Sequence, residues 1–452
     1  MVTDARPHTA PAPFYAASAV ATPVYLLVVL TVAWLALALA FARATPLWQA
    51  PDEPAHYNYV VYLAQHGQLP VLQEGDYPAG RIPIGPEVRP ADVSTFRYES
   101  HQPPLFYALG ALAYKLHPTP FALRALSALL GAALLPVVFL IGREALPGRP
   151  WLQLGLVAFA GFVPMQLFIA GAIENDTLAE LVLSLLLLGC LWRWRPAAIG
   201  LLFGLALLTK VTIYLPAFAL VAYYVWREWR ASALVMTNAV RHPRPGHGFL
   251  ASLGMTKALG TCAEGAVAAV IVCGWWFVRN GFVYGWLDAL TAVQVRQAQV
   301  AGSQTQTGLF GPGQLWTFVA TSFHSFWGQF GWMSIPLPER DYRVLIILTL
   351  ACGVGWLVVT FRKSSMGVKG QALLWLTFGG VLAGDLIYNL KFLQPQGRYL
   401  FPALAPIAVF YVCGFAGLFP KRMQPHAVAA LSMALVLYSA VVLQRELIPA
   451  FR

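Results

Sequence analysis

Long hydrophobic runs separated by short polar segments dominate the chain from end to end. A run of about 18 or more apolar residues is long enough to cross the hydrocarbon core of a bilayer as a helix. The pattern therefore predicts eleven transmembrane helices, several of them short. The predicted spans are residues 19–42, 121–141, 151–170, 178–191, 197–208, 211–226, 258–278, 342–361, 371–390, 399–418 and 427–444.

Two long polar segments interrupt this pattern, one at 43–120 and the other at 283–341. The first contains a predicted helix at 53–65 that ends at a glycine, and a short apolar helix at 104–116. The second contains an amphipathic helix near 314–330 that is rich in Trp and Phe. Helices that are too short to span, or that carry many aromatic residues, are typical of the membrane interface.

The composition agrees with a membrane protein, because 58% of the 452 residues are hydrophobic and only 11% are charged. Soluble domains carry about 25% charged residues. We therefore predict an all-α, polytopic protein with one integral membrane domain, residues 1–452. Its predicted parts are the first span at 19–42, the first outer loop at 43–120, the central spans at 121–282, the second long outer loop at 283–341 and the C-terminal spans at 342–452.

The formal net charge of +11 has a topological explanation. If the N-terminus is cytoplasmic, 15 of the 30 Lys and Arg residues lie on the inner side beside about four carboxylates, and the other 15 face about 15 carboxylates on the outer side. Membrane proteins carry an excess of Lys and Arg on the cytoplasmic side. We therefore predict a multi-pass protein of the inner (plasma) membrane whose two polar loops face outward, and we predict no nucleic-acid binding.

The predicted outer face collects the residues that can carry chemistry. Asp52 and Glu53 follow the first span, and His56 comes one helical turn later. The basic residues at helix ends on this face are Lys210, Arg279 and Arg398. Arg and Lys in such places bind phosphate, and a nearby carboxylate can deprotonate an acceptor hydroxyl. The pattern indicates group transfer from a lipid-phosphate donor.

Several motifs in this order resemble the GT-C superfamily of membrane glycosyltransferases, which includes the protein O-mannosyltransferases and the lipid A aminoarabinose transferase. The first motif is the Asp52-Glu53 pair followed by His56. The others are Glu99-Ser100-His101-Gln102-Pro103-Pro104-Leu105-Phe106-Tyr107, Leu207-Leu208-Thr209-Lys210, Gly274-Trp275-Trp276-Phe277-Val278-Arg279-Asn280 and Gly397-Arg398-Tyr399-Leu400-Phe401-Pro402. By order and spacing, the resemblance covers nearly the whole chain.

The resemblance implies an inverting glycosyltransferase that moves a sugar from a polyprenyl-phosphate donor to an acceptor on the outer face. Asp52 matches the catalytic carboxylate of these proteins, the general base, and we group Glu53 and His56 with it. Lys210 and Arg398 match positions near the donor phosphate. The further candidates are Arg279 and Tyr399 for the donor phosphate, and Tyr57, Glu99, His101 and Gln102 for the acceptor.

Cofactor and acceptor stay open at this point. Some relatives bind a divalent metal through carboxylates of the second outer loop, where this chain has Glu174 and Asp176. Several relatives need none, and Glu174-Asn175-Asp176 also reads as a plain turn and helix cap. The acceptor is an envelope glycan, a lipid or a protein. His101, directly before two prolines, is equally a loop-packing residue.

The other candidates also have structural interpretations. Asp52 fits the N-cap position of the helix at 53–65. His56 lies on the same helical face and can simply pair with Asp52. Lys210 can extend to the interface from between two short spans, and Arg279 can cap the carbonyls of the span that it ends. A cation near a helix start, such as Arg398, is unfavourable unless an anion compensates.

Two other functions compete with the transferase. A transporter or flippase for a lipid-linked or anionic substrate predicts charged residues deep in spans, broken helices and internal repeats. The sequence shows Glu264 and Asp385 near spans and no repeat. A non-catalytic membrane partner or sensor would not depend on Asp52.

Overall fold

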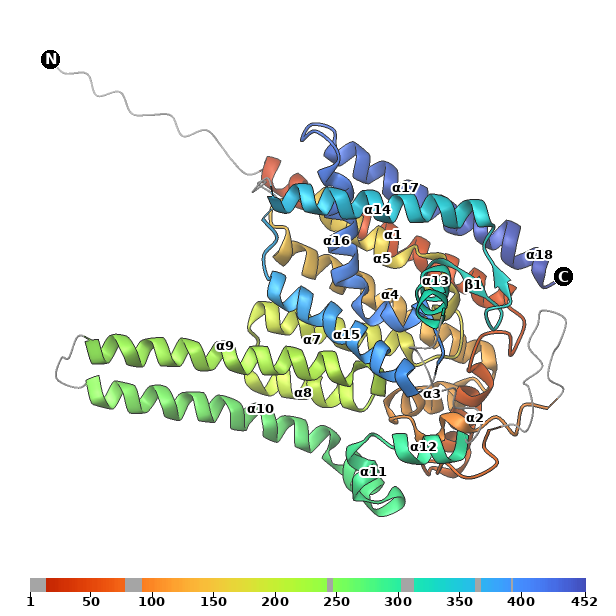
Figure 1. Ribbon diagram of the computed structural model, residues 1–452, viewed down its shortest axis with the longest axis horizontal. Helices are drawn as coiled ribbons and strands as arrows, with labels where there is room; N and C mark the ends of the chain where they lie inside the picture. Colours follow the sequence, from red (N-terminus) through yellow and green to blue (C-terminus); the bar gives the residue numbers. More distant parts are fainter. Residues whose placement is uncertain (1–13, 78–91, 242–246, 302–312, 362–366, 392) are drawn as a thin grey trace.

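The computed structural model of the chain describes residues 14–77, 92–241, 247–301, 313–361, 367–391 and 393–452. Helices make up most of this part of the chain (Figure 1). The two strands in it, β1 (Gln329–Phe330) and β2 (Ile335–Pro336), form an antiparallel ribbon in which Phe330 pairs with Ile335. Parts of both predicted outer loops, 78–91 and 302–312, lie outside the described residues.

Seven stretches of the described chain are long and apolar enough to cross a membrane. They lie in α1 (Phe14–Ala44), α4 (Pro120–Ala145), α10 (His247–Tyr284), α14 (Glu339–Phe361), α15 (Gln371–Lys391), η4 with α16 (Gly397–Ala403 and Leu404–Gly417), and α17 with η5 and α18 (Gln424–Val442, Leu443–Leu447 and Ile448–Ala450). An eighth span results if α5 (Pro150–Gly161) and α6 (Pro164–Ala170) are taken together, although they bend by 62°. The bend is at Pro164, because proline cannot continue the helical hydrogen bonding.

Helices occupy all eleven predicted spans, but the number of eleven crossings is not confirmed. The remaining three predicted spans fall on α7 (Asp176–Trp192), α8 (Pro196–Leu207) and α9 (Tyr214–Arg241), the last preceded by η2 (Val211–Ile213). Over the described residues, none of the three meets the criteria of length and hydropathy. Between the predicted spans 211–226 and 258–278 the described chain stays helical, because α9 and α10 extend beyond these spans and project together from the bundle (Figure 1).

The polar segments form short helices at one end of the bundle (Figure 1). They are α2 (Glu53–His66), η1 (Tyr98–His101), α3 (Leu105–Leu116), α11 (Trp286–Leu290), α12 (Gln294–Ala301) and α13 (Gln314–Trp327). The predictions of a helix at 53–65 and of a short helix at 104–116 are confirmed by α2 and α3. Gly67 closes α2 with a φ of 66°, a left-handed conformation that favours glycine. The predicted helix at 314–330 ends earlier, because Gly328 leaves the helical conformation.

Small residues allow the closest crossings between helices. A Cβ atom on Gly200 of α8 would lie 2.0 Å from the carbonyl oxygen of Gly265 in α10. A Cβ atom on Gly355 of α14 would lie 1.9 Å from the carbonyl oxygen of Gly414 in α16. Such contacts are typical of membrane helices, where packing of small residues drives association.

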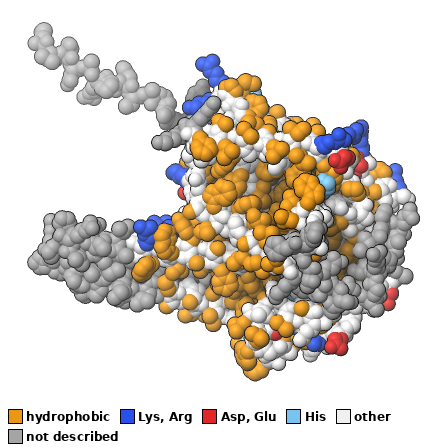
Figure 2. Space-filling model, viewed as in Figure 1, with side chains coloured by type: hydrophobic (Ala, Val, Ile, Leu, Met, Phe, Trp, Pro, Cys, Tyr) orange, Lys and Arg blue, Asp and Glu red, His pale blue; other side chains and the backbone are white. Residues whose placement is uncertain are grey.

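Hydrophobic side chains cover the broad middle of the surface, whereas charged side chains gather toward its edges (Figure 2). Large apolar side chains are exposed on several spans, for example Val32 at 62%, Ile271 at 74% and Ile347 at 67%. A soluble protein would bury such residues, but a bilayer solvates them. The chain is therefore a polytopic helical membrane protein.

The two ends of the bundle carry different segments. At one end, the Lys369 amide donates to the Ala145 carbonyl at 2.9 Å, which joins two segments predicted to be cytoplasmic. Asp52 and Arg398, both predicted on the outer side, meet where α2 begins, among the short helices at the other end (Figure 1). The separation of the two sets of loops agrees with the predicted topology, and which end faces the cytoplasm stays a prediction.

Candidate active site

Asp52 occupies the N-cap position of α2 but does not cap it. Its backbone is left-handed, with φ 63° and ψ −7°, and its side chain makes no capping hydrogen bond. Capping residues normally have an extended backbone, and their side chains accept a hydrogen bond from the first turn. Aspartate tolerates the left-handed region better than most residues. The N-cap interpretation thus explains the position of Asp52 but not the direction of its side chain.

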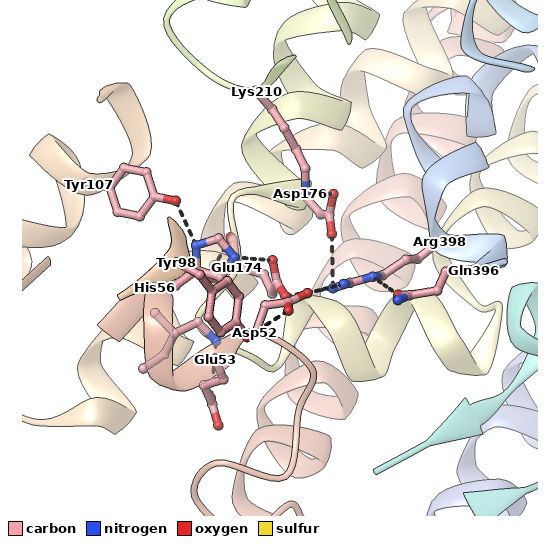
Figure 3. A network of polar contacts seen from close by, with 12 residues as sticks. Asp52, Glu53, His56, Tyr98, Tyr107, Glu174, Asp176, Lys210, Gln396 and Arg398 are labelled. Carbon is pink, nitrogen blue, oxygen red and sulfur yellow. Dashed lines mark hydrogen bonds and ion pairs between the residues drawn. The ribbon is translucent and has the colours of Figure 1, made fainter. Parts of the chain in front are cut away.

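The Asp52 carboxylate is bound by an arginine and a tyrosine instead. Arg398 Nη2 donates to Oδ2, and the Tyr98 hydroxyl donates to Oδ1 at 3.0 Å (Figure 3). Burial tends to raise the pKa of Asp52, but the charges of Arg398 and His56 and the hydrogen bonds from Arg398 and Tyr98 together outweigh this effect and lower the pKa below its usual value. The side chain is nevertheless 24% exposed. Asp52 is therefore ionised, oriented and accessible.

Arg398 is the centre of the network (Figure 3). Its side chain is only 2% exposed, although it comes from the start of a predicted span. Besides Asp52, it donates through Nη1 to Glu174 Oε1 at 2.7 Å and through Nε to Gln396 Oε1 at 2.6 Å. Asp176 Oδ2 lies 3.7 Å from Nη1. One buried guanidinium thus joins carboxylates from α2 and from the segment that begins α7.

The start of α7 supplies two buried carboxylates. Glu174 is fully buried and Asp176 is 1% exposed. Lys210 Nζ, between α8 and η2, donates to Asp176 Oδ1 at 2.6 Å. Both carboxylates also benefit from the positive end of the α7 helix dipole. The structure therefore brings together Asp52, Glu174, Asp176, Lys210 and Arg398, which the sequence predicted to lie on one face.

Asn175, between these two carboxylates, has no partner among the described residues. Its side chain is fully buried, and neither its oxygen nor its nitrogen forms a hydrogen bond there. Asp176 Oδ2 has none either. Buried polar atoms are almost always satisfied in folded proteins, because leaving them unpaired costs about 1–3 kcal/mol each. These atoms are available to a bound molecule.

His56 pairs with Glu174 and not with Asp52, which corrects the pairing expected from helical spacing. Its Nε2 lies 3.0 Å from Glu174 Oε2, and its Nδ1 lies 2.7 Å from the Tyr107 hydroxyl. Burial alone lowers the pKa of His56, but the Glu174 carboxylate, together with the charges of Glu99 and Asp52, outweighs this effect and raises the pKa above its usual value. With a charged His56, the cluster contains three cations and three carboxylates, so its net charge is zero. The cations are His56, Lys210 and Arg398, and the carboxylates are Asp52, Glu174 and Asp176.

Glu53 points away from this network (Figure 3). It is fully buried, and Arg124 of α4 donates to it through Nε at 2.6 Å and through Nη2 at 2.7 Å. The backbone amides of Trp48 and Ile173 also donate to its carboxylate. Arg124 further binds three carbonyls at the end of α1. Glu53 thus ties the beginning of α2 to α1 and α4.

The two remaining donor candidates lie in different places. Arg279 lies over the rings of Trp276 and Tyr284, at 5.3 and 5.5 Å, and donates to the Pro70 carbonyl at 2.8 Å. These contacts lie outside the Asp52–Arg398 network, so Arg279 supports the loop that follows α2. Tyr399 lies next to the network, with its ring 5.6 Å from the Arg398 guanidinium carbon.

The predicted acceptor residues surround α2. Tyr57 packs against Trp48, with ring centres 5.0 Å apart. His101 contacts the Tyr98 carbonyl through Nδ1 at 2.9 Å, and burial lowers its pKa. The Gln102 carbonyl accepts from the Tyr59 hydroxyl at 3.2 Å. Glu99 and Gln102 each have a buried side-chain oxygen without a partner among the described residues.

The carboxylates fit cationic side chains better than a metal ion. Among the described residues, no group of three or more His, Cys, Asp and Glu side chains is arranged to hold a metal. Glu174 and Asp176, the predicted ligands, are engaged by Arg398 and Lys210. A metal ion would compete with these groups for the same oxygens. In this arrangement, Arg398 and Lys210 supply the positive charge that a metal would bring.

Sequence reasoning missed residues that complete the site. Tyr98 and Tyr107 bind Asp52 and His56. Tyr107 ends the Glu99–Tyr107 motif and Tyr98 directly precedes it, but the sequence predicted no role for either. Arg124 had a stronger signal, because a lone charge within an apolar span usually has a buried partner. Gln396 and Asn175 gave no signal, because neutral amides are common in loops.

Comparison with known proteins gives a likeness of fold. No protein-family model matches the chain, and no curated protein matches it. Among solved structures, the chain is similar to ArnT from Cupriavidus metallidurans bound to undecaprenyl phosphate, with 15% identity, a TM-score of 0.42 and coverage of 95% of this chain and 73% of that one. ArnT, a lipid A aminoarabinose transferase, is a GT-C glycosyltransferase.

The chain is also similar to the oligosaccharyltransferase AglB from Archaeoglobus fulgidus, another GT-C glycosyltransferase, in complex with an inhibitory peptide and a dolichol-phosphate. Here the identity is 14% and the TM-score is 0.44, over 95% of this chain and 55% of that one. For a structure of the Archaeoglobus fulgidus oligosaccharyltransferase in complex with Zn and sulfate, the identity is 15% and the TM-score is 0.41. Both proteins belong to the superfamily that the sequence motifs resemble. With TM-scores below 0.5, the likeness assigns no residue and no substrate.

Proposed function

We propose that the chain is an inverting glycosyltransferase that moves a sugar from a polyprenyl-phosphate donor to an acceptor hydroxyl, with Asp52 as the general base. One observation carries this proposal: the accessible carboxylate of Asp52 is paired with the buried guanidinium of Arg398, beside Lys210. A base next to cations that suit a phosphate is what such a transfer needs. The type of donor and the inversion come from the sequence resemblance.

In the proposed reaction, the acceptor oxygen attacks the anomeric carbon from the face opposite the phosphate. The new carbon–oxygen bond forms as the bond to the phosphate oxygen breaks, so the configuration inverts. The hydroxyl proton passes to Asp52, and polyprenyl phosphate leaves with one more negative charge than the donor phosphate had. Arg398 and Lys210, with Tyr399 beside them, stabilise this charge as it develops.

Donor binding also accounts for how Asp52 becomes a base. A carboxylate held by Arg398 has a low pKa and is a weak base. A donor phosphate oxygen competes with Asp52 for Nη2 of Arg398. Once displaced, the carboxylate loses the charge that lowered its pKa, and it can turn toward the acceptor. In this scheme, the Arg398–Asp52 pair keeps the base inactive until the donor is bound.

The neighbouring residues then hold the catalytic pair. Tyr98 orients Asp52. His56 positions Glu174, which in turn holds Arg398. We assign Glu53 to the packing of α2 rather than to proton transfer, because its carboxylate is fully buried and bound to Arg124.

The test is sugar transfer in liposomes with an Asp52→Asn variant. Purified protein receives radiolabelled polyprenyl-phosphate sugars and crude envelope acceptors. Loss of the base should reduce transfer by about 10²- to 10⁴-fold. Donor binding should survive and become several-fold tighter, since asparagine competes less well than a carboxylate for Arg398. Asp92→Asn, an exposed aspartate of the same loop, is the matched control.

Two outcomes would contradict the proposed mechanism. Transfer that persists at the wild-type rate in Asp52→Asn removes this residue from the chemistry. Weaker donor binding in the variant would show that Asp52 helps to bind the donor and does not compete with it.

A transporter or flippase is the second candidate, and two observations favour it. The α5–α6 pair is bent by 62°, and broken helices are common in transporters. Glu180 of α7 and Asp385 of α15 are buried within helices, where they bind Gln166 and Asn389. In the same liposomes, a flippase would move labelled lipid between leaflets without an acceptor, and Asp52→Asn would leave that movement intact.

A further inference from the structure

A cavity of about 430 Å³ lies where α10 ends, beside the candidate active site. Its polar and aromatic lining includes Gln73, Tyr284, Trp286, Arg296 and Gln299. The volume falls within the range of about 300–1,000 Å³ that is typical of small-molecule sites. The donor and base functions proposed above use none of these residues.

A smaller cavity of about 140 Å³ lies beside this site. It shares Val71 and Gln73 with the large cavity and reaches Tyr59, Arg97 and Ser100. Tyr59 stacks on Tyr107, with ring centres 3.6 Å apart, and Tyr107 contacts His56. Arg97 directly precedes Tyr98, which binds Asp52. The small cavity therefore lies between the large cavity and the residues that contact Asp52 and His56.

The walls of the large cavity are fixed by side chain–backbone hydrogen bonds. Asp288 accepts from the backbone amides of Val295 at 3.0 Å and Arg296 at 2.8 Å, which anchors the start of α12. Val293, just before them, has a φ of 63°, a strained conformation for a β-branched residue. The Tyr284 hydroxyl accepts from the Leu72 amide at 2.9 Å. These hydrogen bonds fix the backbone around the cavity.

The lining has the chemistry that a sugar ring requires. Gln73 and Gln299 each offer amide donors and an acceptor, which suit neighbouring hydroxyl groups. Trp286 is 57% exposed and presents a flat aromatic surface for the apolar face of a ring. Arg296 adds donors without an acceptor. We propose that this cavity binds a saccharide unit of the acceptor, so that the acceptor is a glycan; this rests on the proposed transferase function.

The surroundings of the cavity place the glycan at the membrane surface. Phe282, Leu287 and Leu290 are 79%, 73% and 83% exposed, next to the end of a predicted span. Exposed apolar residues at such a boundary insert into the interface. A glycan can reach this level either as part of a polymer or as the headgroup of a glycolipid, and the same cavity chemistry serves both.

The kinetic test compares Gln299→Ala and Trp286→Ala with Trp316→Ala, a control tryptophan that is 75% exposed on α13. With a glycan acceptor, each cavity variant should raise the acceptor KM about tenfold, the effect of one lost contact of about 1.4 kcal/mol. The kcat and the donor KM should stay within about twofold of wild type, a difference below 0.5 kcal/mol. An unchanged acceptor KM, or a raised donor KM, overturns the proposal.

A binding test separates this inference from the proposed function. Wild type, Asp52→Asn and Gln299→Ala in nanodiscs are titrated with maltotetraose, mannotetraose, chitotetraose and short-chain glycolipids that carry the same glycans. Binding to Asp52→Asn but not to Gln299→Ala supports the cavity even if transfer fails. Binding of free oligosaccharides indicates a polymer acceptor, and binding of glycolipids alone indicates a lipid-linked one. If no saccharide binds, the cavity is not a glycan site.

Discussion

At the scale of single residues, two adjacent carboxylates differ sharply in their surroundings. Asp52 is 24% exposed and bound to Arg398, whereas Glu53 is fully buried and bound to Arg124. Asp52 precedes α2 and Glu53 is its first residue, and the sequence grouped them together. The two side chains leave the start of α2 in different directions. Asp52 is therefore a candidate base, whereas Glu53 forms a structural ion pair.

Glu53→Gln should therefore lower the stability of the fold and not only the rate of transfer. Breaking one side of a buried ion pair costs about 3–5 kcal/mol, because the partner charge stays buried without compensation. In detergent, the unfolding temperature should fall strongly for Glu53→Gln and hardly at all for Glu339→Gln, which changes an exposed residue. Adding Arg124→Gln should recover part of the loss. Equal stability of Glu53→Gln and wild type would mean that this pair does not hold α2.

His56 should make the stability depend on pH in the neutral to alkaline range. Its pKa is raised in the folded protein, above an unfolded value of about 6.5. A raised pKa means that the folded state holds the proton more tightly, so the stabilisation is complete below about pH 6.5 and is lost as pH rises through the folded-state pKa. Unfolding temperatures measured from pH 6 to 9 should fall more steeply for wild type than for His56→Gln. Parallel curves for the two proteins would show that His56 does not carry this charge.

At the scale of elements, η4 positions Arg398 because it lies directly against α13. The Gly397 amide donates to Ser325 Oγ at 2.7 Å. A Cβ atom on Gly397 would lie 2.2 Å from the Phe326 nitrogen and 2.2 Å from the Ser322 oxygen. Both are backbone atoms of a helix, so neither can move away easily. Only glycine at position 397 lets η4 pack this closely on α13, and this packing fixes the position of Arg398.

Gly397→Ala should displace Arg398 and reduce transfer strongly, even though the new methyl group touches no reacting atom. A misplacement of about 1 Å can cost about 10²-fold in rate. Gly379→Ala in α15, where a Cβ would meet nothing within 4 Å, is the control and should retain activity. Transfer and the unfolding temperature are measured for both variants. Wild-type transfer by Gly397→Ala would show that α13 does not position Arg398.

At the scale of the whole molecule, the loops divide into two sets at opposite ends of the bundle. The positive-inside rule predicts that the set richer in Lys and Arg is cytoplasmic. In a background without the native cysteines, Asp92→Cys should react with an impermeant maleimide in intact cells. Arg195→Cys should react only after permeabilisation. Both positions are exposed in the fold. The opposite labelling pattern would invert the topology and move the candidate site to the cytoplasmic side.

The sequence by itself determined the helical membrane class, the positions of most helices and the gathering of acidic and basic residues on one face. These features follow from hydrophobic periodicity and from glycine and proline positions, which act locally along the chain. The number of crossings did not follow, because several helices are too short or too polar for length alone to decide.

Only the tertiary structure decided which charge meets which. Asp52 and Arg398 are 346 positions apart, and Glu53 and Arg124 are 71 apart. His56 binds Glu174 although helical spacing favoured Asp52. Burial makes an unpaired charge so costly that each buried ion must find a partner. The choice among several partners depends on how the helices pack, and no local pattern in the sequence records that packing.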